Sequence, residues 1–201
     1  MTKFLLIRHA TNDTVGKRLA GRMAGLSLNE EGRAQANDLA VRLTGLPIAA
    51  IYSSPLERAV ETAGPMAKVL NLEPVLSEDF LEIEFGDWTN GAFEEIGKQR
   101  QFQRFNSFRS CTRIPGGELM LEAQLRMMTG LEKLRVRHQQ ETVAVISHAD
   151  MIKAAVAFYA GIHLDMFHRI EISPASVSVI EIDDETTRIL LVNDTGRINL
   201  D

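Results

Sequence analysis

The sequence predicts an α/β fold of three layers, in which helices cover both faces of a mostly parallel central sheet. Solid apolar runs at residues 4–7 and 143–146 are typical of strands that are buried on both faces. Segments with helical spacing of apolar residues separate the strands over most of the chain, and this alternation favours a layered α/β architecture. Only the C-terminal part reads as strands alone, and we expect it to add antiparallel pairing at the sheet edge.

The first expected helix follows a polar, glycine-containing loop over residues 11–25. Its start at Ser27–Glu30 resembles a capping box, in which Ser27 would accept a hydrogen bond from the first turn. An apolar stripe through Ala34, Leu39, Ala40 and Leu43 predicts the buried side of this helix.

The second strand is expected over residues 48–52, followed by a helix that runs to Leu70. Ser54 is a plausible N-cap of that helix, with Pro55 at its first position. The remaining elements are expected in this order: a short strand over 74–76, an irregular stretch over 79–91, helical sequence from Phe93, a break at 115–117, a helix over 118–138, a strand over 143–146, a helix over 151–160, and strands over 167–172, 176–182 and 188–192.

Composition indicates a single globular domain over residues 1–201, since 45% of the chain is hydrophobic and 24% is charged. The formal net charge of −5 argues against nucleic acid or a membrane surface as a partner. Cys111 is the single cysteine, which excludes an internal disulfide and suggests a reducing compartment. The first strand begins directly after Met1, leaving no room for a signal peptide, and we expect a cytoplasmic protein. The sequence does not indicate an oligomeric state.

Two strands end in a histidine followed by an alanine, at Arg8-His9-Ala10 and at Ser147-His148-Ala149. Ligands of parallel sheets bind outside the carboxyl ends of the strands, so the two histidines are expected to meet there. The alternative is that His9 packs in the core and Arg8 pairs with a carboxylate, because charge is costly to bury without a partner.

Two further charged groups are candidates for chemistry. Arg58 lies near the start of its helix, where an arginine can clamp an anion, or it is a surface residue beside Glu57 and Glu61. Glu82 has apolar neighbours that should raise its pKa and make it a usable acid. Glu84 is the rival for that role, and both could instead be loop acids held by backbone donors.

Four motifs at residues 4–10, 52–63, 81–88 and 145–149 occur in an order that resembles the histidine phosphatase superfamily, in its phosphoglycerate-mutase-like branch. The resemblance covers essentially the whole chain and extends to residues 21–36 and 115–118. It implies the phosphoglycerate-mutase-like version of the three-layer fold.

The resemblance also implies roles for five residues. His9 would be the nucleophile that forms a phosphohistidine. Arg8, Arg58 and His148 would bind the phosphoryl oxygens and neutralise their charge. Glu82 would protonate the leaving oxygen and later take a proton from water. Because arginines supply the positive charge, neither a metal nor a cofactor is expected.

Departures from the family pattern concern substrate contacts rather than the reaction. Ala10 replaces the usual glycine, and Val15 stands where an asparagine is usual, with Asn12 as the candidate to replace it. Ala149 replaces the glycine after the second histidine and is a candidate substrate contact. Arg22 is another, because the family pattern places its loop at the rim of the pocket.

The expected activity is metal-independent hydrolysis of small phosphorylated metabolites, with such a metabolite or inorganic phosphate as ligand. The alternatives are phosphoglycerate-mutase-type phosphoryl transfer and a non-catalytic phosphate-binding regulator. Residues 88–117 are expected to form a cap that is shorter than in the mutases, which must exclude water. Its phenylalanines and arginines could bind a ring and a second anion, or they could form an ordinary amphipathic helix, which we favour.

Overall fold

A computed structural model describes residues 1–196 of the chain. Its main sheet has six strands in the order β4-β3-β6-β1-β7-β8. The strands are β1 (Thr2–Arg8), β3 (Ile48–Ser53), β4 (Val75–Leu76), β6 (Thr142–Ser147), β7 (Val177–Ile182) and β8 (Thr187–Asp194). Strands β4, β3, β6 and β1 pair in parallel, whereas β7 and β8 add antiparallel pairs beside β1. The predicted fold class, a mostly parallel sheet with an antiparallel C-terminal edge, is confirmed.

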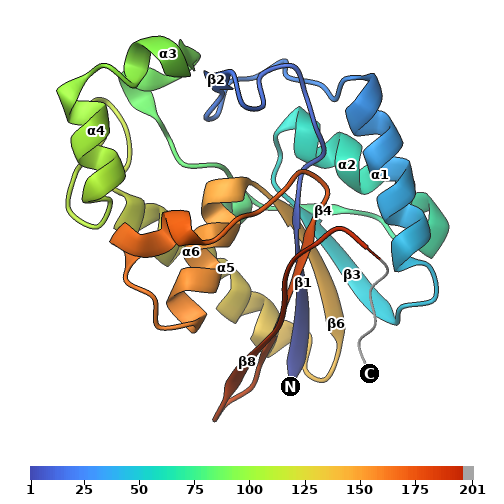
Figure 1. Cartoon of the computed structure of the whole chain (residues 1–201). Helices are drawn as coiled ribbons and strands as arrows, with labels where there is room; N and C mark the ends of the chain where they lie inside the picture. The colour runs from blue at the N-terminus through green and yellow to red at the C-terminus, as the bar shows by residue number, and fades with distance from the viewer. Residues whose placement is uncertain (197–201) are drawn as a thin grey trace.

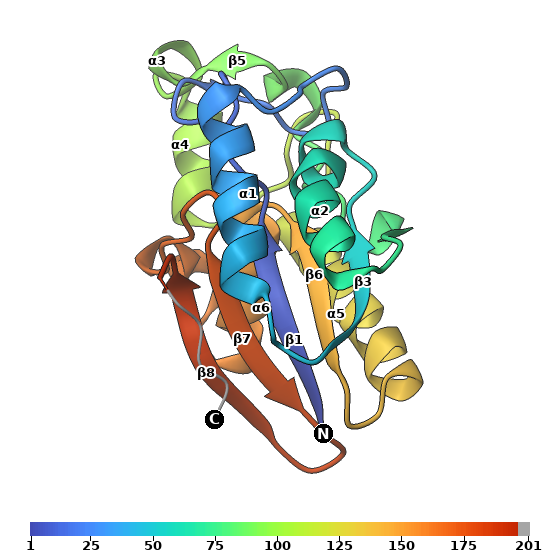
Figure 2. The same cartoon turned by 90° about the vertical axis from the view of Figure 1, so that its right-hand side faces the viewer.

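The apolar run of β1 is buried on both faces, as predicted. Phe4 and Leu6 contribute to one core cluster, and Leu5 and Ile7 contribute to the other. Helices α1 (Glu30–Leu43) and α2 (Glu57–Leu70) cover the Leu5 side, while α5 (Met120–Arg137) and α6 (Ala149–Tyr159) cover the Phe4 side. Figures 1 and 2 show these helix pairs on opposite faces of the sheet. None of the helices in residues 1–196 combines the length and apolarity needed to cross a membrane.

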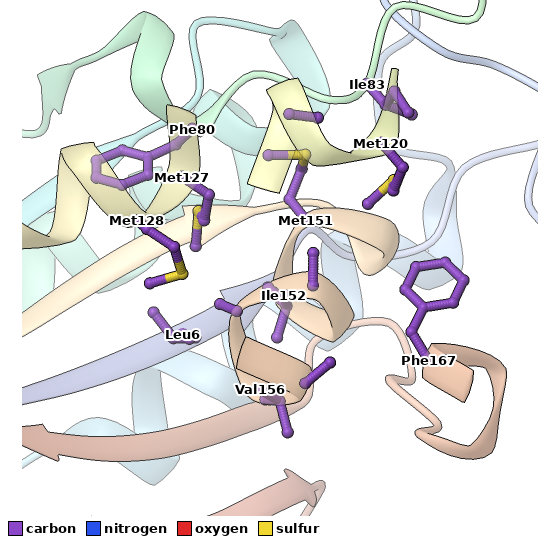
Figure 3. Packing of buried hydrophobic residues seen from close by; sticks show 14 of the residues in the cluster. Leu6, Phe80, Ile83, Met120, Met127, Met128, Met151, Ile152, Val156 and Phe167 are labelled. Carbon is purple, nitrogen blue, oxygen red and sulfur yellow. The ribbon is translucent and has the colours of Figure 1, made fainter. Parts of the chain in front are cut away.

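The core on the α5 and α6 side is rich in methionine (Figure 3). Met120, Met127 and Met151 are completely buried in it together with Ile83. Methionine is unbranched and fills irregular space between helices and a sheet. Ile83 therefore anchors in this core the segment that carries Glu82.

Residues 88–117 contain β5 (Gly91–Ala92), which pairs with β2 (Arg18–Leu19), and the helices α3 (Phe93–Ile96) and α4 (Arg100–Ser107). Figure 1 shows α3 beside β2 at the end of the molecule away from the N-terminus, with α4 below α3 along the side of the molecule. Phe102 and Phe105 are buried, and their ring centroids lie 5.2 and 5.5 Å from that of Trp88. These two phenylalanines are core residues, in agreement with the amphipathic interpretation of α4.

Two predicted helix starts are wrong in detail. Asn29, not Ser27, caps α1, because its side chain accepts the hydrogen bond of the Gly32 N–H. Helix α2 begins at Glu57 with Leu56 as an N-cap that has no side-chain hydrogen bond. Ser54 is not the N-cap, because the helix begins three residues after it; its hydroxyl contacts His148 at 2.9 Å and accepts a weak hydrogen bond from the Leu56 N–H at 3.4 Å.

The strand predicted over residues 167–172 is also wrong, since residues Leu164–Arg169 form the 3₁₀ helix η3. The side chain of His163 accepts a hydrogen bond from the Asp165 N–H and caps this helix. Phe167 and Ile170 are buried and lie three residues apart, which suits a 3₁₀ turn better than the two-residue period of a strand. Two other short 3₁₀ helices, η1 (Glu78–Phe80) and η2 (Gly86–Trp88), flank the Glu82 segment.

Gly32 lets α1 approach the loop that follows β1. A Cβ atom at this position would lie 1.9 Å from the carbonyl oxygen of Thr11. We expect Gly32→Ala to lower the free energy of unfolding by about 1–3 kcal/mol, because the loop must move away. The matched control is Gly64→Ala in α2, where nothing lies within 4 Å of the added Cβ. This control should raise the same free energy by about 0.5–1 kcal/mol. Urea unfolding measures both, and equal stability of Gly32→Ala and the parent would contradict the close approach.

Candidate active site

Three neighbouring strands end at the same edge of the sheet. Arg8 of β1 lies opposite Ser147 of β6, and Ser53 of β3 lies opposite Ile146 of β6. His9, His148 and Ser54 follow these strand ends directly in the sequence. A cavity of about 120 Å³ lies at this edge, with Arg8, His9, Asn12, Arg58, Glu82 and Asp150 among its lining residues. The cavity therefore occupies the place where ligands of parallel sheets bind.

The prediction that the two histidines meet is confirmed, since the ring centroids of His9 and His148 lie 5.2 Å apart. Nδ1 of His9 lies 2.8 Å from the carbonyl oxygen of Ala10. A carbonyl oxygen only accepts, so Nδ1 carries the proton and donates it, leaving the lone pair on Nε2. Burial, together with the charges of Arg58 and Arg8, holds the pKa of His9 well below its usual value. His9 is therefore a neutral imidazole whose Nε2 has no hydrogen-bond partner among residues 1–196 and keeps its lone pair for attack.

His148 is completely buried and contacts the other members of the site. Its Nδ1 lies 3.3 Å from Nη2 of Arg58, which can only donate, so Nδ1 accepts. Its Nε2 lies 2.9 Å from the hydroxyl oxygen of Ser54 and donates to it in the neutral tautomer. Burial and the charge of Arg58 hold the pKa of His148 well below its usual value. Although it touches His9 and Arg58, His148 is not among the residues that line the cavity in the described structure.

Arg8, Arg58 and Asn12 bring unpaired hydrogen-bond donors to the cavity. Nη1 of Arg8 donates to the carbonyl oxygen of Ile172 at 2.6 Å, and Nη2 of Arg58 donates to that of Gly21 at 2.7 Å. The buried Nε of Arg8, the Nε and Nη1 of Arg58 and the Nδ2 of Asn12 have no partner within residues 1–196. Buried unpaired donors are costly, and a bound anion would satisfy them.

Asn12 is held in place by its own loop. Its Oδ1 accepts hydrogen bonds from the N–H and the hydroxyl of Thr14, at 3.0 and 2.7 Å. Because Oδ1 is fully occupied by donors, the amide group is oriented and Nδ2 remains for the cavity. Asn12 is thus placed at the cavity, and its replacement of the asparagine of the family pattern stays a prediction.

Glu82 lies at the cavity wall. Its Oε1 accepts a hydrogen bond from the Ile83 N–H at 2.9 Å. Burial and the nearby Asp150 carboxylate raise the pKa of Glu82 to about 7. The protonated and ionised forms are therefore both available near neutral pH, which suits a group that must give and later take a proton.

A model of the histidine phosphatase superfamily (branch 1) matches residues 4–195 of the chain. This chain belongs to the histidine phosphatase superfamily. Phosphoserine phosphatase 1 of Hydrogenobacter thermophilus is 33% identical over 97% of this chain and 93% of its own length. A bifunctional protein of Mycobacterium tuberculosis is 32% identical over 97% of this chain, which spans 54% of that protein.

Two solved structures are similar over 99% of this chain and 100% of their own. YhfR of Bacillus stearothermophilus has a TM-score of 0.90 at 28% identity. A phosphoserine phosphatase mutant from Entamoeba histolytica, in complex with phosphoserine, has a TM-score of 0.88 at 26% identity. Family and relatives confirm the prediction of a phosphoric monoester hydrolase, and they favour hydrolysis over the mutase alternative.

Two predicted substrate contacts of this histidine phosphatase lie elsewhere than expected. Arg22 does not line the cavity. Its Nε donates to the carbonyl oxygen of Glu82 at 2.8 Å, and its Nη2 donates to Oε1 of Glu118 at 2.8 Å. Its Nη1 lies 3.8 Å from Oε2 of Glu84, so the contacts of all three nitrogens go to the Glu82 segment and to Glu118. Ala149 is the first residue of α6, and it is likewise not among the residues that line the cavity.

Sequence reasoning missed two charged residues of the cavity, Arg18 and Asp150. Arg18 belongs to the glycine-containing loop and is fixed by Asn90, whose carbonyl and side-chain oxygens accept from its Nε at 2.9 and 2.8 Å. Asp150 follows His148 by two residues in the first turn of α6, where an acid is normally explained by the helix dipole. The position of Asp150 directly after a strand that ends in a histidine is the sequence feature that could have predicted its place at the site. Among residues 1–196, no group of His, Cys, Asp or Glu side chains is arranged to hold a metal ion.

Proposed function

We propose that this histidine phosphatase hydrolyses small phosphate monoesters through a phosphohistidine on His9, with phosphoserine as the first substrate to test. The observation that carries the proposal is the free Nε2 of a neutral His9, beside the unpaired donors of Arg8, Arg58 and Asn12. A neutral imidazole attacks phosphorus, and the donors neutralise the charge on the phosphoryl oxygens.

The first step forms a bond from Nε2 of His9 to phosphorus and breaks the bond from phosphorus to the ester oxygen. Glu82 gives its proton to the departing oxygen, so the product leaves as an alcohol. In the second step the Glu82 carboxylate takes a proton from water, and the resulting hydroxide attacks phosphorus. The bond to Nε2 then breaks, phosphate leaves, and both His9 and protonated Glu82 are restored.

His148 joins the phosphate site when the substrate is bound. A phosphate dianion close to a buried imidazole favours the charged form and raises its pKa. The protonated Nδ1 of His148 then donates to a phosphoryl oxygen, while Nη2 of Arg58 turns from Nδ1 to the phosphate. Both groups would thus stabilise the charge that develops in the transition state.

The proposal also covers the domain organisation, the ligand and the partners of the protein. A single catalytic domain over residues 1–201, with residues 88–117 as its cap, acts on a small phosphorylated metabolite and has neither nucleic acid nor a membrane as partner. The last positions of that range, 197–201, lie outside the described residues. Cys111 is an exposed free cysteine, which suits the reducing environment of the cytoplasm.

The proposed chemistry needs no metal, and this can be tested directly. Phosphatase activity is measured on a panel containing phosphoserine, 3-phosphoglycerate, sugar phosphates and an aryl phosphate, with and without EDTA. We expect the rates to be the same in both conditions and not to require a bisphosphorylated primer. His9→Ala, purified in the same way, controls for contaminating phosphatases. Loss of activity in EDTA that Mg²⁺ restores would contradict the mechanism, and dependence on the primer would identify a mutase instead.

A further inference from the structure

We propose that Asp150 binds an ammonium group of the substrate. This group is attached to the second carbon from the ester oxygen, so Asp150 selects phosphorylated amino acids and amino alcohols. The inference rests on the proposed phosphatase function and names the substrate class of the same cavity. It assigns a binding role to a residue that the phosphoryl-transfer steps do not use.

A second carboxylate is unexpected in a cavity built for an anion. Asp150 and Glu82 both line it, together with Arg8. Glu82 has a task in proton transfer, whereas Asp150, whose charge is shared with Arg109 at 3.2 Å, does not help to bind a phosphate dianion. A substrate that brings its own positive charge gives this carboxylate a second partner on the cavity side.

Asp150 is held rigidly by Arg109 of the cap segment. Its Oδ2 accepts a hydrogen bond from Nη1 of Arg109 at 3.2 Å. The guanidinium of Arg109 is buried between the rings of Phe105 and Phe167, 4.4 and 4.2 Å from their centroids. Its other nitrogens donate to Nε2 of His168 at 3.0 Å and to the side chain of Asn106 at 2.8 Å.

This arrangement leaves one oxygen of Asp150 for a ligand. Within residues 1–196, Arg109 engages only Oδ2, and Oδ1 accepts no hydrogen bond. Asp150 remains partly exposed, with 21% of its side chain accessible. A carboxylate whose position is already fixed loses little conformational freedom when it binds a cation.

The cavity has independent signs of being a ligand site. Asn12 is 3% exposed and Arg58 is 1% exposed, and both bring unpaired donors to it. These donors place the phosphate near His9, and Glu82 marks the side of the leaving oxygen. Asp150 lines the same cavity as Glu82, the proposed acid, and lies close enough for its charge to raise the pKa of Glu82. An ammonium two carbons from the ester oxygen would fall within reach of the Asp150 carboxylate.

The competing explanation is that Asp150 only keeps Glu82 protonated. In that case its removal would affect every substrate with the same leaving-group requirement in the same way. Ammonium recognition instead predicts an effect that depends on the substrate. Phosphoserine and 3-phosphoglycerate separate the two explanations, because they differ only in an ammonium group against a hydroxyl group.

The test compares kcat/KM for these two substrates in the parent enzyme and in Asp150→Asn. The parent should prefer phosphoserine. The asparagine keeps an oxygen for Arg109 but loses the charge, so the ratio of the two kcat/KM values should fall about 10- to 100-fold, mainly through KM for phosphoserine. The matched control is Glu171→Gln, which removes another acid whose charge acts on Arg8 but whose side chain is 80% exposed. This control should leave the ratio unchanged.

Several results would overturn the inference. A parent enzyme without preference for phosphoserine, or a ratio that Asp150→Asn leaves unchanged, would do so. An equal loss of kcat/KM for both substrates would show that Asp150 acts only by keeping Glu82 protonated. If the parent hydrolyses no phosphate ester at all, the proposed function fails, and calorimetric binding of the two compounds still tests the ammonium site. Tighter binding of phosphoserine that Asp150→Asn abolishes supports it, and equal binding refutes it.

Discussion

His9→Ala is expected to lower kcat by at least about 10⁴-fold, because the mutation removes the only group proposed to attack phosphorus. The fold should survive, since within residues 1–196 the side chain makes a single hydrogen bond, to the carbonyl oxygen of its neighbour Ala10. Turnover of an aryl phosphate measures the loss, and circular dichroism with thermal unfolding checks the fold. The matched control is His163→Ala, which removes a histidine whose side chain is 66% exposed and should leave kcat unchanged.

The same residue should carry the phosphoryl group during turnover. Rapid acid-free quenching of the parent enzyme with ³²P-labelled substrate should trap label that is stable in base and labile in acid, as expected of a phosphoramidate. His9→Ala should trap none, and His163→Ala should trap as much as the parent. Label on a serine or an aspartate would refute the assignment of the nucleophile.

The sequence could predict much of this site because the decisive residues lie directly after recognisable strands. His9 and His148 each end a buried apolar run, and parallel pairing of β1 with β6 brings such positions together. Apolar neighbours marked both Glu82 and Glu84, and the family resemblance selected Glu82. These are local patterns, and the fold preserves them.

Sequence pattern can place a residue near the site, but it does not show contacts that depend on packing between distant segments. Asp150 is fixed by Arg109, which depends on Phe105 and Phe167 from separate parts of the chain. Ser54 has the local features of an N-cap, but α2 begins at Glu57 and the Ser54 hydroxyl makes its shorter hydrogen bond to His148, 94 residues away. In such cases a tertiary contact overrides the local preference, and sequence pattern alone cannot reveal which will prevail.

Glu82→Gln is expected to slow the hydrolysis of an alkyl phosphate such as phosphoserine by about 10²- to 10⁴-fold, because a poor leaving group needs a proton. An aryl phosphate leaves as a more stable anion and should be slowed much less. The matched control is Glu84→Gln, since Glu84 does not line the described cavity and its carboxylate lies 3.8 Å from Arg22. Equal slowing of both substrates by Glu82→Gln, or a larger effect of Glu84→Gln, would transfer the acid role to Glu84.

The pH profile gives this assignment a second readout. The pKa of Glu82 is raised to about 7, so its proton is present below that pH and is lost above it. With the alkyl substrate, kcat/KM should therefore fall as pH rises through about 7. The pKa of His9 is held well below its usual value, so His9 should not titrate in this pH range. With the aryl substrate this fall should be shallow, because the proton is not needed. Asp150→Asn removes the neighbouring negative charge and should move the fall to lower pH, since the ionised form of Glu82 becomes easier to reach. A fall that stays in place in Glu82→Gln would show that another group supplies the proton.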